Sequence, residues 1–249
     1  MKRPLRVKAI LLFFMVSFAV LPITASASSL TWDVKVGDQF NYALQRKLMD
    51  ESYAPLMPPW MSFVLKLDEG DVFTATVTGL DNISETITSA QDMPFSHVWL
   101  SMDNGSTNIK ADASQFVVPI GDWDLQTTLL NISDLPDVTM VNTDTEWGIS
   151  EDSSFVGGST TYTYLYEWRY GKANGTLDYA RYRLSTYSGD LIDVIISKWS
   201  EGDPTVLPPE IQPSTILIIA TAGAMGVIIA FLVYRWVKTP RGIAAELGK

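Results

Sequence analysis

Aromatic side chains occupy every second position of the segment TYTYLYEWRY, residues 161–170. An alternation with period two predicts a β-strand that presents all its rings on one face of a sheet. The five rings belong to Tyr162, Tyr164, Tyr166, Trp168 and Tyr170. Together they carry about 1,000 Å² of surface, and leaving it wet would forfeit about 25 kcal/mol, more than the stability of a typical domain. The face must therefore be covered by the protein's own core, by a ligand or by another molecule.

The same period two continues in the C-terminal third of the chain. It predicts three consecutive strands over residues 160–170, 177–187 and 191–199, and the turn-rich connectors GKANG and SGD separate them. Such spacing is typical of an antiparallel meander. The segment VGGST at residues 156–160 lacks the lysine of a phosphate-binding loop, so we interpret it as a turn.

The N-terminal half shows weaker alternation. Residues 32–44 keep one parity across Gly37, which predicts two strand halves joined by a bend. Residues 62–67 and 72–79 flank DEGD and predict a hairpin. Residues 83–90 and 95–102 are expected to add further strands.

One segment between these halves has helical spacing. Leu125, Leu129 and Ile132 fall on one side of a helix, and Asp122 or Asp124 is able to cap its start. We expect this helix to plug an open end of the sheet. The fold class is therefore mainly β: a curved antiparallel sheet or half-open β-barrel of roughly eight to ten strands, with one or two short helices.

Both ends of the chain carry apolar segments. Four basic residues among the first eight positions, an apolar run over residues 9–21 and the small residues Ala25 and Ala27 predict a signal peptide over residues 1–27, the alternative being an uncleaved anchor. Residues 215–233 are 19 consecutive uncharged positions, so we expect a single transmembrane helix over residues 214–237 rather than a buried core helix.

Basic residues and prolines flank the predicted transmembrane helix. Basic residues at 235, 238 and 241 mark the cytoplasmic side, so the tail of residues 238–249 is expected inside the cell. Prolines at 204, 208, 209 and 213 predict an extended stalk over residues 203–213. The β-rich domain, residues 28–202, is then extracellular. Ala222 and Gly226 have a spacing that permits close helix packing, which leaves the oligomeric state open.

The charge composition of the predicted ectodomain limits which kinds of molecule it is expected to bind. Residues 28–213 hold ten basic and 27 acidic residues, a formal charge of 10 minus 27, or −17. Such a surface repels phosphates, so neither nucleic acid nor anionic lipid is expected as a partner. The chain contains no cysteine, so the domain relies on its core and its sheet. Four N-x-S/T sequons make Asn82, Asn104, Asn131 and Asn174 candidate glycosylation sites.

Catalytic and metal-binding patterns are weak. His97 is the only histidine, and with no cysteine this makes a zinc or copper site unexpected; we predict a hydrogen-bonded structural role for it. Asn142, Asp144 and Glu146 would share a strand face, and Asp122 lies near Asp124, yet neither group has the spacing of a calcium loop. Carboxylates are abundant, but no pair is singled out for glycoside hydrolysis. No catalytic residue, metal or cofactor is therefore predicted.

Several segments resemble a known group of proteins. These are the opening WDVKVGDQFNYALQRK, the central VVPIGDWDL, and YEWRY followed by NGTLDY. With the signal peptide and anchor, they are similar to exported, membrane-anchored archaeal (Asgard-type) surface proteins of the "choice-of-anchor S domain" kind. This resemblance implies export, anchoring and a β-rich ectodomain, and no site residue. The expected shape also looks like the half-open β-barrel of bacterial lipoprotein carriers.

Three functional hypotheses follow. The first is a non-enzymatic cell-surface ectodomain for display, adhesion or interaction with a surface protein or glycan, which predicts a filled core and a binding patch on loops. The second is an anchored carrier or receptor for a hydrophobic or amphipathic, lipid-like ligand. It predicts an apolar cavity lined by Tyr162, Tyr164, Tyr166 and Trp168. The third is a surface hydrolase, which predicts carboxylates that converge in a cleft. We favour the first.

Overall fold

The computed structural model describes residues 29–102, 108–110, 112–130 and 137–208. They form one compact unit that ends at Leu207, and a second unit begins at Pro208. The predicted signal peptide, transmembrane helix and tail, the end of the stalk, and the sequons at Asn104 and Asn131 lie outside the described residues. Within the described residues, no helix is long and apolar enough to cross a membrane.

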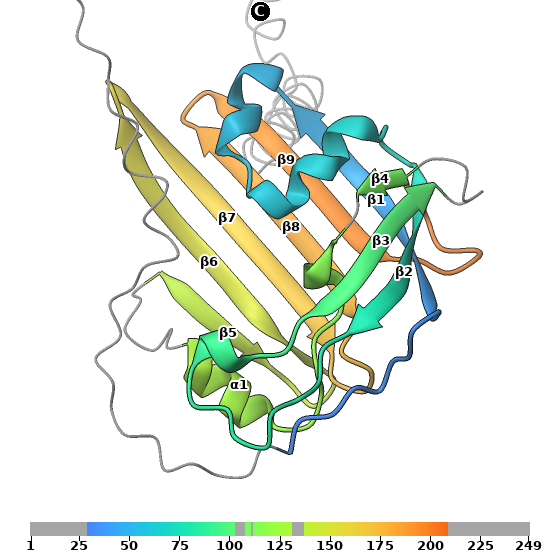
Figure 1. Ribbon diagram of the computed structural model, residues 1–249. Coiled ribbons are helices and arrows are strands. Elements are labelled where there is room, and N and C mark those ends of the chain that lie inside the picture. Colours follow the sequence, from blue (N-terminus) through green and yellow to red (C-terminus); the bar gives the residue numbers. More distant parts are fainter. Residues whose placement is uncertain (1–28, 103–107, 111, 131–136, 209–249) are drawn as a thin grey trace, which may run out of the picture. The chain divides into compact units, whose positions relative to one another are not determined.

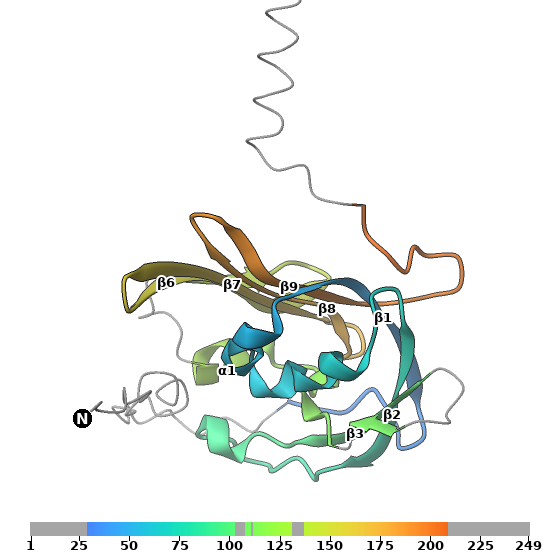
Figure 2. The ribbon, with the colours of Figure 1, turned by 90° about the horizontal axis from the view of Figure 1, so that it is seen from above.

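The described residues contain nine strands in a single antiparallel open sheet of order β4-β3-β2-β1-β9-β8-β7-β6-β5. Figure 2 shows that the sheet curls at β1, so that β2 and β3 lie opposite β7 and β8 with the short helices between them. The predicted class, mainly β with an antiparallel sheet and few helices, is confirmed. The strands are β1 (Gln39–Met49), β2 (Val72–Leu80), β3 (Ser96–Met102), β4 (Asn108–Lys110), β5 (Val138–Asn142), β6 (Glu146–Gly157), β7 (Thr160–Gly171), β8 (Leu177–Thr186) and β9 (Gly189–Lys198).

Five short helices connect the strands of the described chain: η2 (Glu51–Leu56), η3 (Pro59–Lys66), η4 (Ala90–Asp92), η5 (Ser114–Phe116) and α1 (Trp123–Leu130). In Figure 1, η2 and η3 (blue to cyan) lie against the concave face of the sheet in front of β8 and β9. Phe63 of η3 packs its ring 5.5 Å from that of Phe73 and 5.8 Å from that of Phe116. These rings form the centre of the core, together with the fully buried Tyr42.

The C-terminal meander and the helix agree with the sequence. β7, β8 and β9 follow the three predicted strands, and α1 begins one residue after Asp122. The Asp122 carboxylate caps α1, because its Oδ1 accepts a hydrogen bond from the backbone N–H of Leu125 at 2.8 Å. At its other face α1 meets the sheet through Trp123, whose ring centroid lies 5.2 Å from that of Trp147.

The predicted hairpin of residues 62–67 with 72–79 is wrong. Residues 72–79 belong to β2, but residues 59–66 form the 3₁₀ helix η3. Its buried side chains include Met61 and Val64, and Leu67 follows at the same spacing of three, which is the period of a 3₁₀ helix. Leu65, which the strand assignment had placed inside, is exposed.

Two further strand predictions are corrected. The first half of residues 32–44 forms no strand, and β1 starts only at Gln39, after Gly37 with its positive φ of 99°. Residues 83–90 add no strand to the sheet. Instead, Ile87 packs with Leu30 and with Leu129 of α1 in a small second cluster.

The convex face of the sheet carries a buried ion-pair cluster. Asp193 of β9 is only 3% exposed, and both its carboxylate oxygens are occupied. Arg181 donates to them from Nε at 2.9 Å and from Nη2 at 3.0 Å, and Arg46 donates from Nη1 at 3.1 Å. Each donor therefore compensates part of the cost of burying this charge.

Candidate functional site

The aromatic face, defined as Tyr162, Tyr164, Tyr166, Trp168 and Tyr170, lies on one side of β7. The pairing of β7 with β6 is regular from end to end, so these alternate residues all point the same way. Across the ladder to β8, Tyr166 pairs with the inward-facing Tyr182. The aromatic face is therefore on the concave side of the sheet, as the alternation predicts.

Aromatic neighbours cover this face unevenly. At one end, Trp168 packs against Trp147 and Tyr170, with ring centroids 5.5 and 5.3 Å apart. At the other end, the Tyr162 ring stacks on Phe155 at 5.1 Å and meets Tyr53 of η2 at 6.2 Å. Only Tyr170 is buried, at 6% exposure, while the other four rings of the face are half-buried.

Helices η2 and η3 cover the middle of the face through tyrosine hydroxyls. Trp60 Nε1 donates to the Tyr166 hydroxyl oxygen at 2.7 Å. The Tyr182 hydroxyl donates to the backbone carbonyl of Leu56 at 2.8 Å. Burial raises the pKa of Tyr182 to about 12, and it raises the pKa of Tyr166 as well. Both hydroxyls therefore hold residues 51–66 against the sheet.

Glu151 of β6 is a buried carboxylate on the same side of the sheet, directly paired with Tyr166 on β7. It is 4% exposed, and the Tyr164 hydroxyl donates a short hydrogen bond to its Oε1. Burial raises the pKa of the Glu151 carboxyl, and the hydrogen bond from Tyr164 partly opposes this. The Tyr164 pKa is raised by its own burial and by that bond.

Sequence reasoning missed Glu151 because it did not assign β6. The signal was present: Trp147, Glu151 and Phe155 share one parity, so a strand over residues 146–157 would have placed all three on the inner face. Glu151 and Ser153 on the inner parity hid this pattern, because they left no contrast between an apolar and a polar side.

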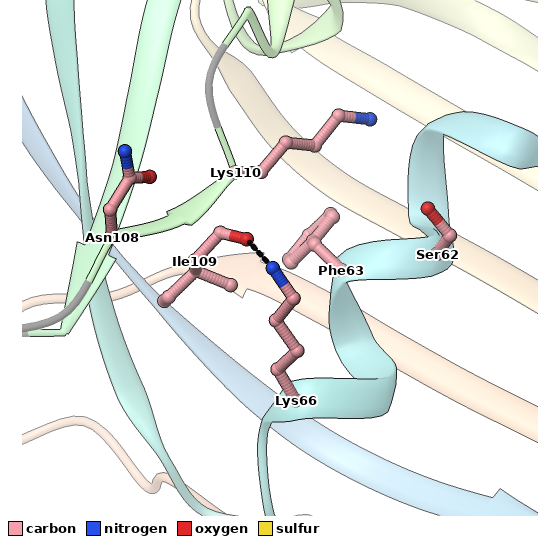
Figure 3. Close-up of a pocket in the computed structure, with 6 residues that line it drawn as sticks. All are labelled: Ser62, Phe63, Lys66, Asn108, Ile109 and Lys110. Carbon is pink, nitrogen blue, oxygen red and sulfur yellow. Dashed lines mark hydrogen bonds between the residues drawn. The ribbon is translucent and has the colours of Figure 1, made fainter.

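The pocket drawn in Figure 3 lies elsewhere, between η3 and β4. Its volume is about 470 Å³, and no residue of β7 lines it. Figure 3 shows Lys66 pointing at the carbonyl of Ile109, to which its Nζ donates at 2.6 Å. Lys110 Nζ donates in the opposite direction, to the Trp60 carbonyl at 2.8 Å. The two lysines thus tie η3 and β4 together across this opening.

His97 lies on the outer surface of β3, between two carboxylates. Its Nδ1 lies 3.2 Å from Asp112 Oδ1, and its Nε2 lies 3.4 Å from Asp81 Oδ1. The hydrogen bonds to Asp112 and then Asp81 raise the pKa of His97. Phe95 and Trp99 flank it and are 55% and 53% exposed. The ring is hydrogen-bonded on both sides, as predicted, and it joins three parts of the chain at the surface.

The remaining candidates are separate from the aromatic face. Asn142 ends β5 and Glu146 begins β6, so they lie on either side of a turn and not on one strand face. Among the described residues, no group of three or more His, Cys, Asp or Glu side chains is placed to hold a metal ion. The sequon residue Asn82 is exposed in a loop. Asn174 is half-buried, and its Oδ1 accepts hydrogen bonds from the Thr176 hydroxyl at 2.7 Å and backbone N–H at 3.1 Å.

Comparisons with protein-family models, curated proteins and solved structures give no match for this chain. The resemblance to archaeal surface proteins stays a prediction. So do export, the membrane anchor and the extracellular location of the β-rich domain.

Proposed function

We propose that this chain is a non-enzymatic cell-surface ectodomain, anchored by one transmembrane helix over residues 214–237, and that it serves display, adhesion or interaction through its aromatic face. The observation that carries this proposal is the half-burial of Tyr162, Tyr164 and Trp168, on either side of the part of the face that η3 covers at Tyr166. Rings that are neither sealed nor fully wet are typical of contact surfaces, where tyrosine and tryptophan combine apolar area with a polar group. The half-open barrel expected from the sequence would hold this surface on a rigid concave sheet.

The carrier hypothesis has less support. It needs an apolar cavity over the aromatic face, yet η2 and η3 lie there and are tied down at Tyr166 and Tyr182. A lipid-like ligand would have to displace residues 51–66 and break both hydrogen bonds. The pocket between η3 and β4 has a mixed lining, with Lys66, Lys110, Asn108 and Ser62 beside Phe63 and Ile109, and not the mainly apolar lining that a hydrocarbon chain needs.

Surface display of the full chain tests the location and the interaction together. Cells that express it are treated with protease before lysis, and we expect cleavage of the β-rich domain on intact cells. Binding of the displaying cells to arrayed glycans and to untransfected cells is then measured. The variant Trp168→Ala should lower that binding, whereas Leu165→Ala, on the same strand but the opposite side of the sheet, should not.

Two results would contradict the proposal. Protection of the domain from protease on intact cells would show that it is not at the surface. A lipid that co-purifies with the full chain, and is lost in Trp168→Ala but kept in Leu165→Ala, would establish the carrier instead.

A further inference from the structure

Glu151 is a buried acidic group without a cation. All ten basic residues of residues 28–213 lie within the described ranges, and none of them forms an ion pair with Glu151. Its one side-chain hydrogen bond in the described structure comes from Tyr164. A carboxylate that is 4% exposed and lacks a counter-charge is costly, because burial removes its hydration. An external cation would compensate this cost.

A second carboxylate adds to the local negative potential. Asp137 precedes β5, and its Oδ2 accepts a hydrogen bond from Ser153 at 2.8 Å. Its charge makes a minor contribution to the raised pKa values of Glu151 and Tyr164. No ion pair of the described residues involves Asp137 either. The surroundings of Tyr164 are thus negative on balance.

Aromatic residues lie near the same carboxylate along β6 and β7. Tyr164 and Tyr166 are its neighbours on β7, and Phe155 lies further along β6 with its ring centroid 6.3 Å from that of Tyr164. Faces of aromatic rings attract cations, most strongly where water is partly excluded. Tyr162 and Tyr164 are half-buried, so a ligand from solvent can reach this end of the aromatic face.

We propose that Glu151, together with the ring of Tyr164, forms a binding site for an organic ammonium group. This inference rests on the proposed interaction through the aromatic face and names the chemistry of the ligand. A weakly hydrated alkylammonium or quaternary ammonium ion gains from both the carboxylate and the ring. Calcium and magnesium would not, because they need about six oxygen ligands and the ring supplies none.

Choline and its neutral isostere 3,3-dimethyl-1-butanol test the site without any variant. Both are titrated into the full chain in a non-ionic detergent, and binding is measured by calorimetry and ligand-observed NMR. We expect saturable binding of choline and an affinity for the isostere that is lower by about tenfold, since the shape is kept and the charge is lost. Phosphatidylcholine vesicles in a parallel titration show whether a lipid headgroup can also present the ammonium group.

Matched variants then locate the site. Glu151→Gln keeps the size and the hydrogen bond from Tyr164, and it should lower the choline affinity by about tenfold. Asp152→Asn makes the same charge change at the next residue, which is exposed and points to the other side of β6, and it should leave the affinity unchanged.

Three outcomes overturn the inference. They are an absence of saturable choline binding, equal binding of choline and the isostere, and an equal loss in Asp152→Asn and Glu151→Gln. The comparison of choline with its isostere decides the matter even if Glu151→Gln does not fold. None of these outcomes affects the protease and cell-binding tests, so failure of this site is distinguishable from failure of the proposed function.

Discussion

Removal of single hydroxyl groups should release η2 and η3 from the sheet. Tyr182→Phe deletes the donor to the Leu56 carbonyl, and Tyr166→Phe deletes the acceptor of the Trp60 indole N–H. Both variants keep the aromatic ring, so ring packing is preserved and the measured change reports the hydrogen bond. The two bonds are the test of whether residues 51–66 are a fixed part of the domain or a removable cover.

The burial of each hydroxyl sets the expected magnitude. Tyr182 is 6% exposed, so the carbonyl of Leu56 is left without a donor in a nearly dry place, and we expect a loss of about 2 kcal/mol. Tyr166 and Trp60 are both half-buried, so water can reach the indole N–H, and a loss of about 1 kcal/mol is expected. The two rings lie 6.5 Å apart and hold the same segment, so the loss in the double variant should differ from the sum of about 3 kcal/mol by a coupling energy, which the double-mutant cycle measures.

Urea unfolding of the full chain, followed by tryptophan fluorescence, measures these losses. For a domain of this size, each 1 kcal/mol corresponds to about 2–4 °C in Tm, which gives an independent check. Tyr187→Phe is the control, because Tyr187 is 98% exposed and its hydroxyl should contribute nothing measurable. If Tyr182→Phe is as stable as Tyr187→Phe, residues 51–66 are not held by these bonds, and a cover that opens for a ligand regains support.

Further substitutions test other parts of the same account. Asp193→Asn should destabilise the fold by about 3 kcal/mol in urea unfolding, because it leaves two buried guanidinium groups without their shared carboxylate. Glu151→Gln should instead shift the urea midpoint upward at neutral pH. The pKa of this carboxyl is raised in the fold, so its ionised form opposes folding. The gain in stability from the variant should shrink as the pH is lowered towards that pKa. The pH dependence at His97 is opposite, because a base whose pKa is raised in the fold stabilises the folded state below about pH 6.5 and loses this contribution as the pH rises through the folded pKa. Thermal melts at several pH values should show this loss of stability. The variant His97→Gln should lack this pH dependence. Gly148→Ala should prevent soluble expression, because an added Cβ would lie 2.0 Å from the carbonyl oxygen of Trp168.

The meander was predictable because each of its strands has one apolar and one polar side. The strand β6, which pairs with β7 over its whole length, was not, although a turn at residues 156–160 was predicted. Its inner positions include Glu151 and Ser153, and most of its outer positions are polar as well. Alternation is visible only when the two faces of a strand differ, so a strand that buries a carboxylate loses its signature.

The error at residues 62–67 has a different origin. Phe63, Leu65 and Leu67 fit a period of two, while Met61, Val64 and Leu67 fit a period of three. Six residues cannot distinguish these periods, and the decisive signal is Pro59, which stands at the start of η3 with its φ already suited to a helix. In the fold, Met61, Val64 and Leu67 are buried, which fits the three-residue period.

The aromatic face itself followed from the sequence, but its partners did not. Trp60 is 106 positions away from Tyr166, and no local pattern links them. The curl of the sheet at β1 brings η3 over β7, and this curl depends on the register of all the strands between them. Local periodicity predicts which side a residue faces, whereas the contact across the concave side is a property of the assembled sheet.

The two buried carboxylates of Asp193 and Glu151 differ in how their negative charge is compensated. Asp193 is 3% exposed and receives three hydrogen bonds from two arginines, so its negative charge is compensated where it is buried. Glu151 is 4% exposed on the opposite side of the same sheet, yet within the described part of the chain it has a tyrosine hydroxyl and no cation as partners. Replacement of Glu151 by a neutral residue would remove the desolvation cost of its buried charge. The same replacement at Asp193 would instead leave two arginines without their shared carboxylate. A buried charge that weakens its own domain and lies beside half-buried rings is best accounted for by a cationic partner from outside, and this contrast is the strongest reason to look for the ligand at Glu151 rather than on the wider acidic surface.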